Sequence, residues 1–139
     1  MQIVIMYNED QKIVFLFSPE LDNAFLQELY GDDLLQAEMV FESSVQQLRN
    51  EQQLAETRFH NGDMQGLKKV IHKMKPLLGY MGMNEIMEEF AVFEQTCAQS
   101  ETAAEAEAGF YHIKIITLEA VKKAEKEIKR LKQHNIQYL

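Results

Sequence analysis

The chain has 139 residues, of which 46% are apolar and 26% charged, and its formal net charge is −8 at pH 7. This length corresponds to one domain, and the apolar content is too high for a disordered chain. The negative charge disfavours nucleic acid as the main partner, because phosphate binding requires a positive surface. No apolar run approaches the roughly 18 residues that span a bilayer, and no cationic signal-peptide start is present. We therefore expect a cytoplasmic protein that binds neither nucleic acid nor membrane.

Glycine and proline are scarce, while Met, Leu, Glu, Gln, Lys and Ala are abundant, which is typical of helical proteins. The single cysteine, Cys97, excludes an internal disulfide and a cysteine-based zinc site. It is consistent with a reducing compartment.

Two apolar runs, residues 3–7 and 13–17, flank the polar residues 8–12 and predict an N-terminal β-hairpin. Because an isolated hairpin is marginal in water, we expect it to pack on the rest of the protein or to pair with a second copy. The chain would then consist of an N-terminal arm, residues 1–17, and a helical bundle, residues 18–139, with homodimerisation through the arm as one outcome. We expect the bundle to retain its helicity without residues 1–16.

Capping and stop signals divide the remainder into helices. A first helix should start at Ser18-Pro19-Glu20 and end before Gly31. A second should start at Asp32 or Asp33 and end at Gly62.

Asp63 should cap a third helix that ends at Gly82, and Asn84 should cap a fourth. Residues 100–109 could be loop or frayed helix, and a long fifth helix follows from Phe110. The predicted fold is all-α: an antiparallel four-helix bundle with an extra N-terminal helix and a short N-terminal β-hairpin.

The end of the fifth helix is rich in lysine. Glu119 and Glu125 precede Lys123 and Lys129 by four residues, the favourable order for ion pairs on a helix surface. With Glu127 also interrupting the basic run, a solvated face is the preferred interpretation.

One histidine stands out on the third helix. On a helical wheel, His72 lies roughly 160° from the centre of the apolar stripe and should face water. Lys68, Lys75, Pro76 and Gly79 lie on the same side. A largely uncharged imidazole is a good nucleophile near neutral pH, the two lysines could offset an incoming anion, and Gly79 would keep the surface low for a partner. From spacing alone, an exposed histidine without a role is the simpler interpretation.

The segment His72-Lys73-Met74-Lys75, followed by Gly82-Met83, resembles the motif of histidine phosphotransfer domains. That family has an apolar residue two positions after the phosphorylated histidine, lysine three after, glycine four after and glycine ten after. Met74, Lys75 and Gly82 match, whereas Pro76 replaces the first glycine. Residues 22–31 and the Asn61-Gly62-Asp63 turn also look like the family's first helix and its turn before the histidine helix.

The resemblance implies a phosphoryl carrier, with His72 as acceptor and Lys75 as charge stabiliser, in a two-component phosphorelay. Lys68, Pro76 and Gly79 would then lie on the face that docks receiver domains. Partners would be response-regulator receiver domains and hybrid sensor kinases; the chain needs no cofactor, and the receiver would supply the aspartate and Mg²⁺. Pro76 bears on phosphotransfer because the family's glycine lets the partner close over the imidazole.

Two other interpretations stay open. The chain could be a degenerate relative that docks on receivers or kinases without accepting phosphate, or an unrelated helical adaptor or dimer built on the fifth helix. A hydrolytic carboxylate pair is disfavoured, because the adjacent Glu88 and Glu89 point about 100° apart on a helix. A four-helix metal site would need Glu-x-x-His pairs, which the sequence lacks.

Overall fold

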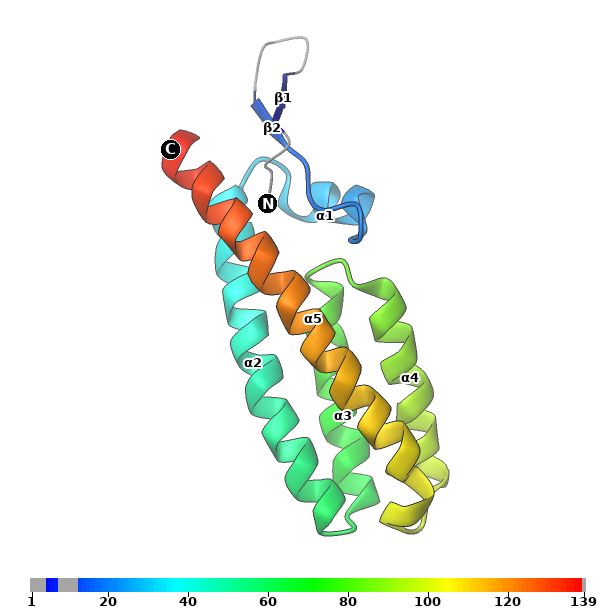
Figure 1. The fold of residues 1–139 in the computed structure, drawn as a ribbon. Helices are drawn as coiled ribbons and strands as arrows, with labels where there is room; N and C mark the ends of the chain where they lie inside the picture. The colour runs from blue at the N-terminus through cyan, green and yellow to red at the C-terminus, as the bar shows by residue number, and fades with distance from the viewer. Residues whose placement is uncertain (1–4, 8–12, 139) are drawn as a thin grey trace.

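The structure, a computed structural model, describes residues 5–7 and 13–138. Figure 1 shows the long helices side by side, with a shorter helix and the paired strands at one end of them. In chain order the elements are β1 (Ile5–Tyr7), β2 (Ile13–Phe15), α1 (Asn23–Tyr30), α2 (Leu34–His60), α3 (Met64–Gly79), α4 (Asn84–Gln99) and α5 (Ala103–Tyr138). The two strands pair antiparallel, with Ile5 opposite Phe15. The predicted all-α bundle with an extra N-terminal helix is confirmed.

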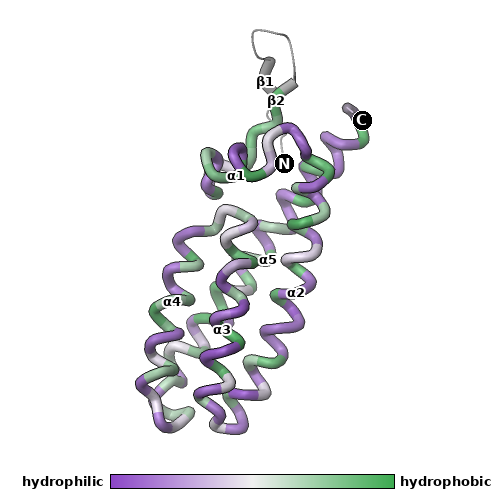
Figure 2. Tube along the Cα trace, turned by 180° about the vertical axis from the view of Figure 1, so that it is seen from behind, coloured by the Kyte–Doolittle hydropathy of each residue, from purple (hydrophilic) through white to green (hydrophobic). Residues whose placement is uncertain are grey.

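The four long helices form a closed ring. Helix α2 packs against α3 and α5, and α4 packs against the same two helices. Helices α3 and α5 therefore occupy opposite corners of the bundle: α5 crosses the front in Figure 1, and α3 lies in front when the molecule is seen from behind in Figure 2. The largest fully buried side chains come from every helix of the ring; they include Phe41, Leu48, Leu67, Ile71, Met74, Leu78, Phe90, Phe110, Ile113 and Leu131.

Several local signals act as the sequence predicts. The side chains of Asp33 and Asp63 cap α2 and α3 by accepting hydrogen bonds from the amides of Gln36 and Gly66. Gly82 follows α3 with φ near +70°, where glycine is favoured. A Cβ on Gly82 would also lie 2.9 Å from Cδ1 of Leu26, so this glycine allows α1 to pack over the α3–α4 turn.

The predicted start of the first helix is wrong. Helix α1 begins at Asn23 and is capped by Asp22, whose side chain accepts from the Phe25 amide at 3.1 Å. Ser18 is engaged elsewhere: its amide donates to Oε2 of Glu127 at 2.6 Å, and its carbonyl accepts from Leu21. These contacts hold residues 18–21 in a turn, so the Ser-Pro-Glu signal does not start the helix.

Two further boundaries differ from the prediction. Met83 rather than Asn84 occupies the N-cap of α4, and the side-chain Nδ2 of Asn84 donates to Oδ2 of Asp22 at 2.7 Å, which ties α4 to the start of α1. Residues 100–109 are mostly helical, because α5 already begins at Ala103. A Cβ on Gly109 would lie 2.7 Å from the Phe93 ring, so the glycine there permits close contact with α4.

The N-terminal arm shares the bundle's core. Phe15 and Phe17 are each only 2% exposed, and the Arg130 guanidinium lies 4.8 Å from the Phe15 ring centroid. Arg130 also donates to the Leu16 carbonyl at 2.7 Å and pairs with Glu127, both of them buried in α5. The arm therefore packs on the bundle, as expected. Phe15 and Phe17 belong to the same core as the helices, so the two sides of a boundary at residue 17 do not have separate cores. The rest of the predicted hairpin, residues 1–4 and 8–12, lies outside the described residues.

The lysine-rich end of α5 exposes Lys122, Lys126, Lys129 and Lys132 to solvent, as predicted, but its acidic residues are placed differently. Glu127 is 1% exposed and so does not belong to a solvated face. Glu125 pairs with Arg49 of α2 at 3.2 Å rather than with Lys129, and Lys132 pairs with Glu42 of α2 at 3.2 Å. The ion pairs of this region therefore join two helices instead of following one.

Candidate functional site

His72 lies on the outward side of α3. The buried stripe of this helix is formed by Met64, Leu67, Val70, Ile71, Met74, Leu77 and Leu78. The side chain of His72 points away from that stripe and is 68% exposed. The helical-wheel prediction of a solvent-facing histidine is confirmed.

A carboxylate from the neighbouring helix holds the imidazole. Oε1 of Glu94, on α4, lies 3.0 Å from Nδ1 of His72. Oε2 of the same carboxylate lies 2.6 Å from Nζ of Lys75, one turn after His72 on α3. Glu94 thus bridges the two residues that the sequence singled out, and its own side chain is only 12% exposed.

These contacts define the charge of Glu94. Burial alone would raise the pKa of this carboxyl group, but its hydrogen bonds and charge interactions with Lys75 and His72 outweigh burial and lower the pKa. Glu94 is therefore ionised at neutral pH and can only accept hydrogen bonds. In neutral His72, Nδ1 must then carry the proton that is donated to Glu94, which leaves the Nε2 lone pair free.

A shallow apolar groove of about 320 Å³ runs beside the imidazole between α3 and α4. His72, Lys75 and Pro76 line it from α3, and Met87, Glu88 and Ala91 line it from α4. The structure thus brings three of the five predicted site residues together on one surface. Helix α3 runs unbroken through Pro76, whose side chain is exposed.

The other two predicted residues lie off this groove. Lys68, one turn before His72, is half-buried and does not line it. Gly79 faces α4: a Cβ there would lie 3.5 Å from Sδ of Met87, an ordinary packing distance. Its small size therefore matters less for the open surface than the sequence suggested.

Sequence reasoning missed Glu94. It lies four residues after Phe90 and three before Cys97, both buried, so a helical wheel places its carboxylate beside the apolar stripe of α4. That position on the wheel would have allowed the prediction of a half-buried carboxylate at Glu94. Its pairing with His72, however, depends on how α3 and α4 are set against each other.

The other reactive groups in the described part of the chain offer no competing site. Burial, with the charge of Glu94 nearby, raises the pKa of the Cys97 thiol to about 11, so the thiol stays protonated. Exposed His112 on α5 contacts Glu89 on α4 at 2.7 Å, but no lysine joins that pair among the described residues. Within residues 5–7 and 13–138, no three metal-ligating side chains cluster, and no helix is long and apolar enough to cross a membrane.

No family model matches the chain, and neither do any curated protein or any solved structure. A function for the chain is therefore inferred from the chemistry of the His72 site.

Proposed function

We propose that the chain is a histidine phosphotransfer protein that relays a phosphoryl group between receiver-domain aspartates through His72. The observation that carries this proposal is the 3.0 Å contact between Glu94 and Nδ1 of an imidazole that is otherwise 68% exposed. A histidine held at one nitrogen and open at the other is suited to nucleophilic attack on a group carried by a second protein.

In the proposed step, the Nε2 lone pair of His72 attacks the phosphorus of a receiver's aspartyl phosphate. A nitrogen–phosphorus bond forms, the bond between phosphorus and the aspartyl oxygen breaks, and the electron pair of that bond leaves with the aspartate carboxylate. Attack by a neutral imidazole leaves positive charge on the ring. Glu94 stabilises that charge through its hydrogen bond to Nδ1, as a carboxylate does beside a catalytic histidine.

Lys75 has two tasks in this scheme. Its ion pair with Glu94 holds the carboxylate in place beside His72. Because an ammonium group has three donors, Lys75 can also turn a proton toward the phosphoryl oxygens while it remains next to Glu94. Its side chain is 23% exposed, which leaves that approach open.

The groove beside His72 supports the docking half of the proposal. Apolar surface from Pro76, Met87 and Ala91 lies directly beside the nucleophile, so a receiver that covers it would bring its aspartyl phosphate to Nε2. Val92 of α4, which is 68% exposed, adds apolar surface on the same helix. The receiver would supply the aspartate and Mg²⁺, and hybrid sensor kinases that carry such receivers would be further partners.

A second candidate is a docking protein that binds receivers or kinases without accepting phosphate. Pro76 favours it, because the exposed ring adds atoms beside the imidazole where the resembling family has glycine. The two candidates share a binding surface and differ only in the covalent step.

The deciding experiment incubates the chain with a phosphorylated receiver domain and assays acid-labile label, since phosphohistidine is acid-labile. We expect label on the original chain and none on His72→Gln, with helicity unchanged because the side chain faces water. His112→Gln is the matched control, since His112 is also exposed and also contacts a glutamate. Label that persists in His72→Gln would refute the assignment. Receiver binding without any label would favour the docking protein.

A further inference from the structure

Helix α5 carries an apolar stripe that the bundle leaves largely exposed, although its first member, Tyr111, also contacts the ring of Phe59 on α2 edge-on. Tyr111, Ile115 and Leu118 follow one another at steps of four and three residues, so they share one face of the helix. Their exposed fractions are 46%, 57% and 59%. Three large apolar side chains aligned on one outward helix face resemble one half of a helix–helix contact.

The ion pairs of α5 place this stripe on the outside of the bundle. Lys114 lies on one side of it and pairs with Glu56 of α2 at 2.5 Å. On the other side, His112 contacts Glu89 of α4 at 2.7 Å. The stripe thus lies between the two contacts that bind α5 to its neighbours, on the corner of the bundle opposite α3 and His72.

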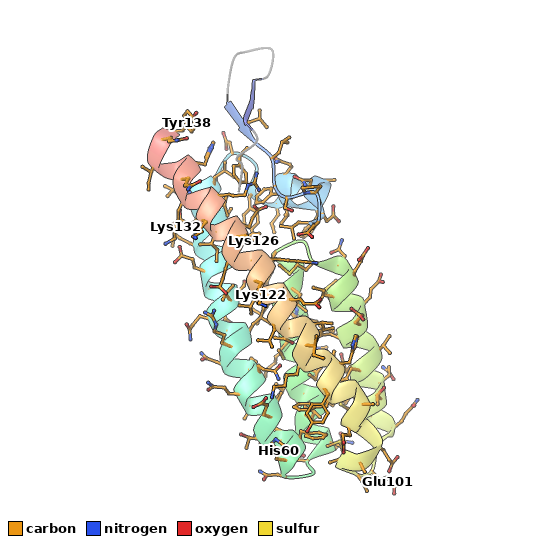
Figure 3. All side chains as sticks on the ribbon, viewed as in Figure 1. His60, Glu101, Lys122, Lys126, Lys132 and Tyr138 are labelled. Atoms are coloured by element: carbon orange, nitrogen blue, oxygen red, sulfur yellow. The ribbon has the colours of Figure 1, made fainter. Side chains whose placement is uncertain are left out.

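Exposed charged residues lie on the same face on both sides of the stripe. Before the stripe lie the small Ala104 and the acidic Glu107, and after it lie Lys122 and Lys129, all of them exposed. In Figure 3, Glu101 is labelled near the start of α5, and Lys122, Lys126 and Lys132 follow toward its C-terminal end. On this surface Glu107 therefore lies before the stripe and Lys122 after it, while Glu125, on the same side of the helix as Glu107, is paired with Arg49 of α2.

We propose that this surface, which we call the α5 face (Ala104, Glu107, Tyr111, Ile115, Leu118 and Lys122), binds the α5 face of a second copy in antiparallel orientation. A two-fold axis next to Ile115 would place Tyr111 opposite Leu118 of the other copy. The same axis would place Glu107 opposite Lys122, because both pairs are centred on the same point of the helix. Charge complementarity and apolar contact thus select one register.

Antiparallel pairing follows from the charge pattern. In a parallel pair Lys122 would face its own equivalent, and like charges in direct contact are unfavourable. Ala104 has a small side chain, which allows the helices to approach closely. An interface with the same patch on both copies also closes on itself and does not propagate into a fibre.

The size of the α5 face determines the strength that we expect. A single pair of crossing helices falls at the low end of specific interfaces, below about 1,200 Å² of total buried surface. The dimer should therefore be weak and dependent on concentration. Both copies would keep His72 accessible, since α3 lies at the opposite corner of each bundle. The proposal is independent of phosphotransfer.

Sedimentation velocity of the full chain from about 1 µM to about 1 mM tests the association. We expect the monomer to convert to dimer within this range, and Ile115→Glu to remain monomeric throughout with unchanged helicity. Met39→Glu is the matched control, because Met39 is 69% exposed on α2, away from the α5 face, and this variant should dimerise normally. A chain that stays monomeric at the highest concentration would overturn the proposal, as would equal dimerisation of the Ile115 variant.

Charge swaps test the register separately. Lys122→Glu and Glu107→Lys should each weaken the dimer about tenfold, since two-fold symmetry makes each substitution act twice and exposed pairs contribute modestly. The double variant has the original net charge and should restore the dimer. If Lys122→Glu instead strengthens association, or if the double variant does not restore it, the antiparallel arrangement is wrong.

Discussion

Glu94 on α4 lies 3.0 Å from Nδ1 of His72 on α3, so a residue from a different helix determines which imidazole nitrogen is open to solvent. The same carboxylate contacts Lys75. Any change in how α3 packs on α4 would therefore change the orientation of the imidazole and the position of the lysine together. The reactivity of His72 is in this sense a property of the helix pair, and Glu94 is the residue through which it can be tested.

Glu94→Gln should slow phosphoryl acceptance by His72 about tenfold. A hydrogen bond to a charged group is worth about 1.5 kcal/mol, and 1.4 kcal/mol in a barrier corresponds to a factor of ten. The measurement is the rate of acid-labile labelling from one phosphorylated receiver. Nitrogen NMR of His72 provides a second readout, since loss of the carboxylate should shift the ring toward a mixture of tautomers. Glu89→Gln is the control, because Glu89 lies on the same helix but contacts His112 instead of His72.

An unchanged labelling rate in Glu94→Gln, together with an unchanged tautomer, would show that the contact has no part in the reaction. A structural effect alone would lower stability without changing the tautomer of His72.

Lys75→Ala should slow labelling without abolishing it. The substitution removes a cation near the nucleophile, but an ion pair that is partly open to solvent contributes only about 1 kcal/mol or less. It also leaves Glu94 without its ammonium partner, so the variant should lose stability as well. Lys73→Ala, which alters an exposed lysine next to His72, is the control for the change in net charge. Complete loss of label in Lys75→Ala would assign the lysine a larger role.

The local signals of the sequence predicted most of the fold because they act within a few residues. Asp33 and Asp63 cap helices whose first turns they can reach without any help from the rest of the chain. Ser18 had an equally good signal, but its amide is held by Glu127, more than a hundred positions later, and the helix starts elsewhere. A sequence pattern contains no measure of that competing contact.

The candidate site shows the same difference between local signals and contacts that are distant in sequence. Exposure of His72 followed from the periodicity of one helix, and the motif around it drew attention to Lys75. Glu94 could not be predicted as the partner of His72 and Lys75, because its position relative to His72 depends on the packing of α3 on α4.

Arg130→Leu should destabilise the fold by roughly 3 kcal/mol. The substitution leaves Glu127 as a buried carboxylate without its cation, and breaking a buried ion pair from one side typically costs about 3–5 kcal/mol. It also removes the donor to the Leu16 carbonyl. Urea unfolding followed by circular dichroism measures the change. Lys129→Leu, one residue earlier and exposed, is the control. A loss below 1 kcal/mol would mean that the pair does not anchor the arm.

Removal of residues 1–17 should likewise destabilise the bundle, although the sequence alone predicts that the bundle retains its helicity without residues 1–16. Phe15 and Phe17 are buried against it, and truncation of a buried phenylalanine costs about 3–5 kcal/mol. The single variants Phe15→Ala and Phe17→Ala measure the same effect with the chain length unchanged. If both variants keep the free energy of unfolding of the original chain, the arm does not contribute to the core.

Acidification should destabilise the protein in part through His134. Burial lowers the pKa of this imidazole, which packs against the rings of Phe15 and Tyr138. The unfolded chain then binds more protons than the folded one. The contribution of neutral His134 to the free energy of unfolding is therefore complete above the unfolded pKa of about 6.5 and declines as the pH falls below it. His134→Gln should show a smaller loss of unfolding free energy between about pH 7.5 and about pH 5.5.

Replacement of Pro76 separates helix stability from receiver access. An interior proline costs a helix about 3 kcal/mol relative to alanine, and glycine costs about 1. Helix α3 is continuous through Pro76, so Pro76→Ala should stabilise the protein by up to about 3 kcal/mol and Pro76→Gly by up to about 2. Smaller gains would mean that neighbouring residues have adapted to the proline.

The functional effect of replacing Pro76 depends on shape, because the ring lines the groove beside His72. Pro76→Gly should accept phosphate faster, or from more receivers, whereas Pro76→Ala should fall between it and the original chain. Labelling rates from one phosphorylated receiver, compared among the three proteins, decide the matter. Rates that rise in the order of helix stability, with alanine fastest, would assign the effect to the backbone instead of to access.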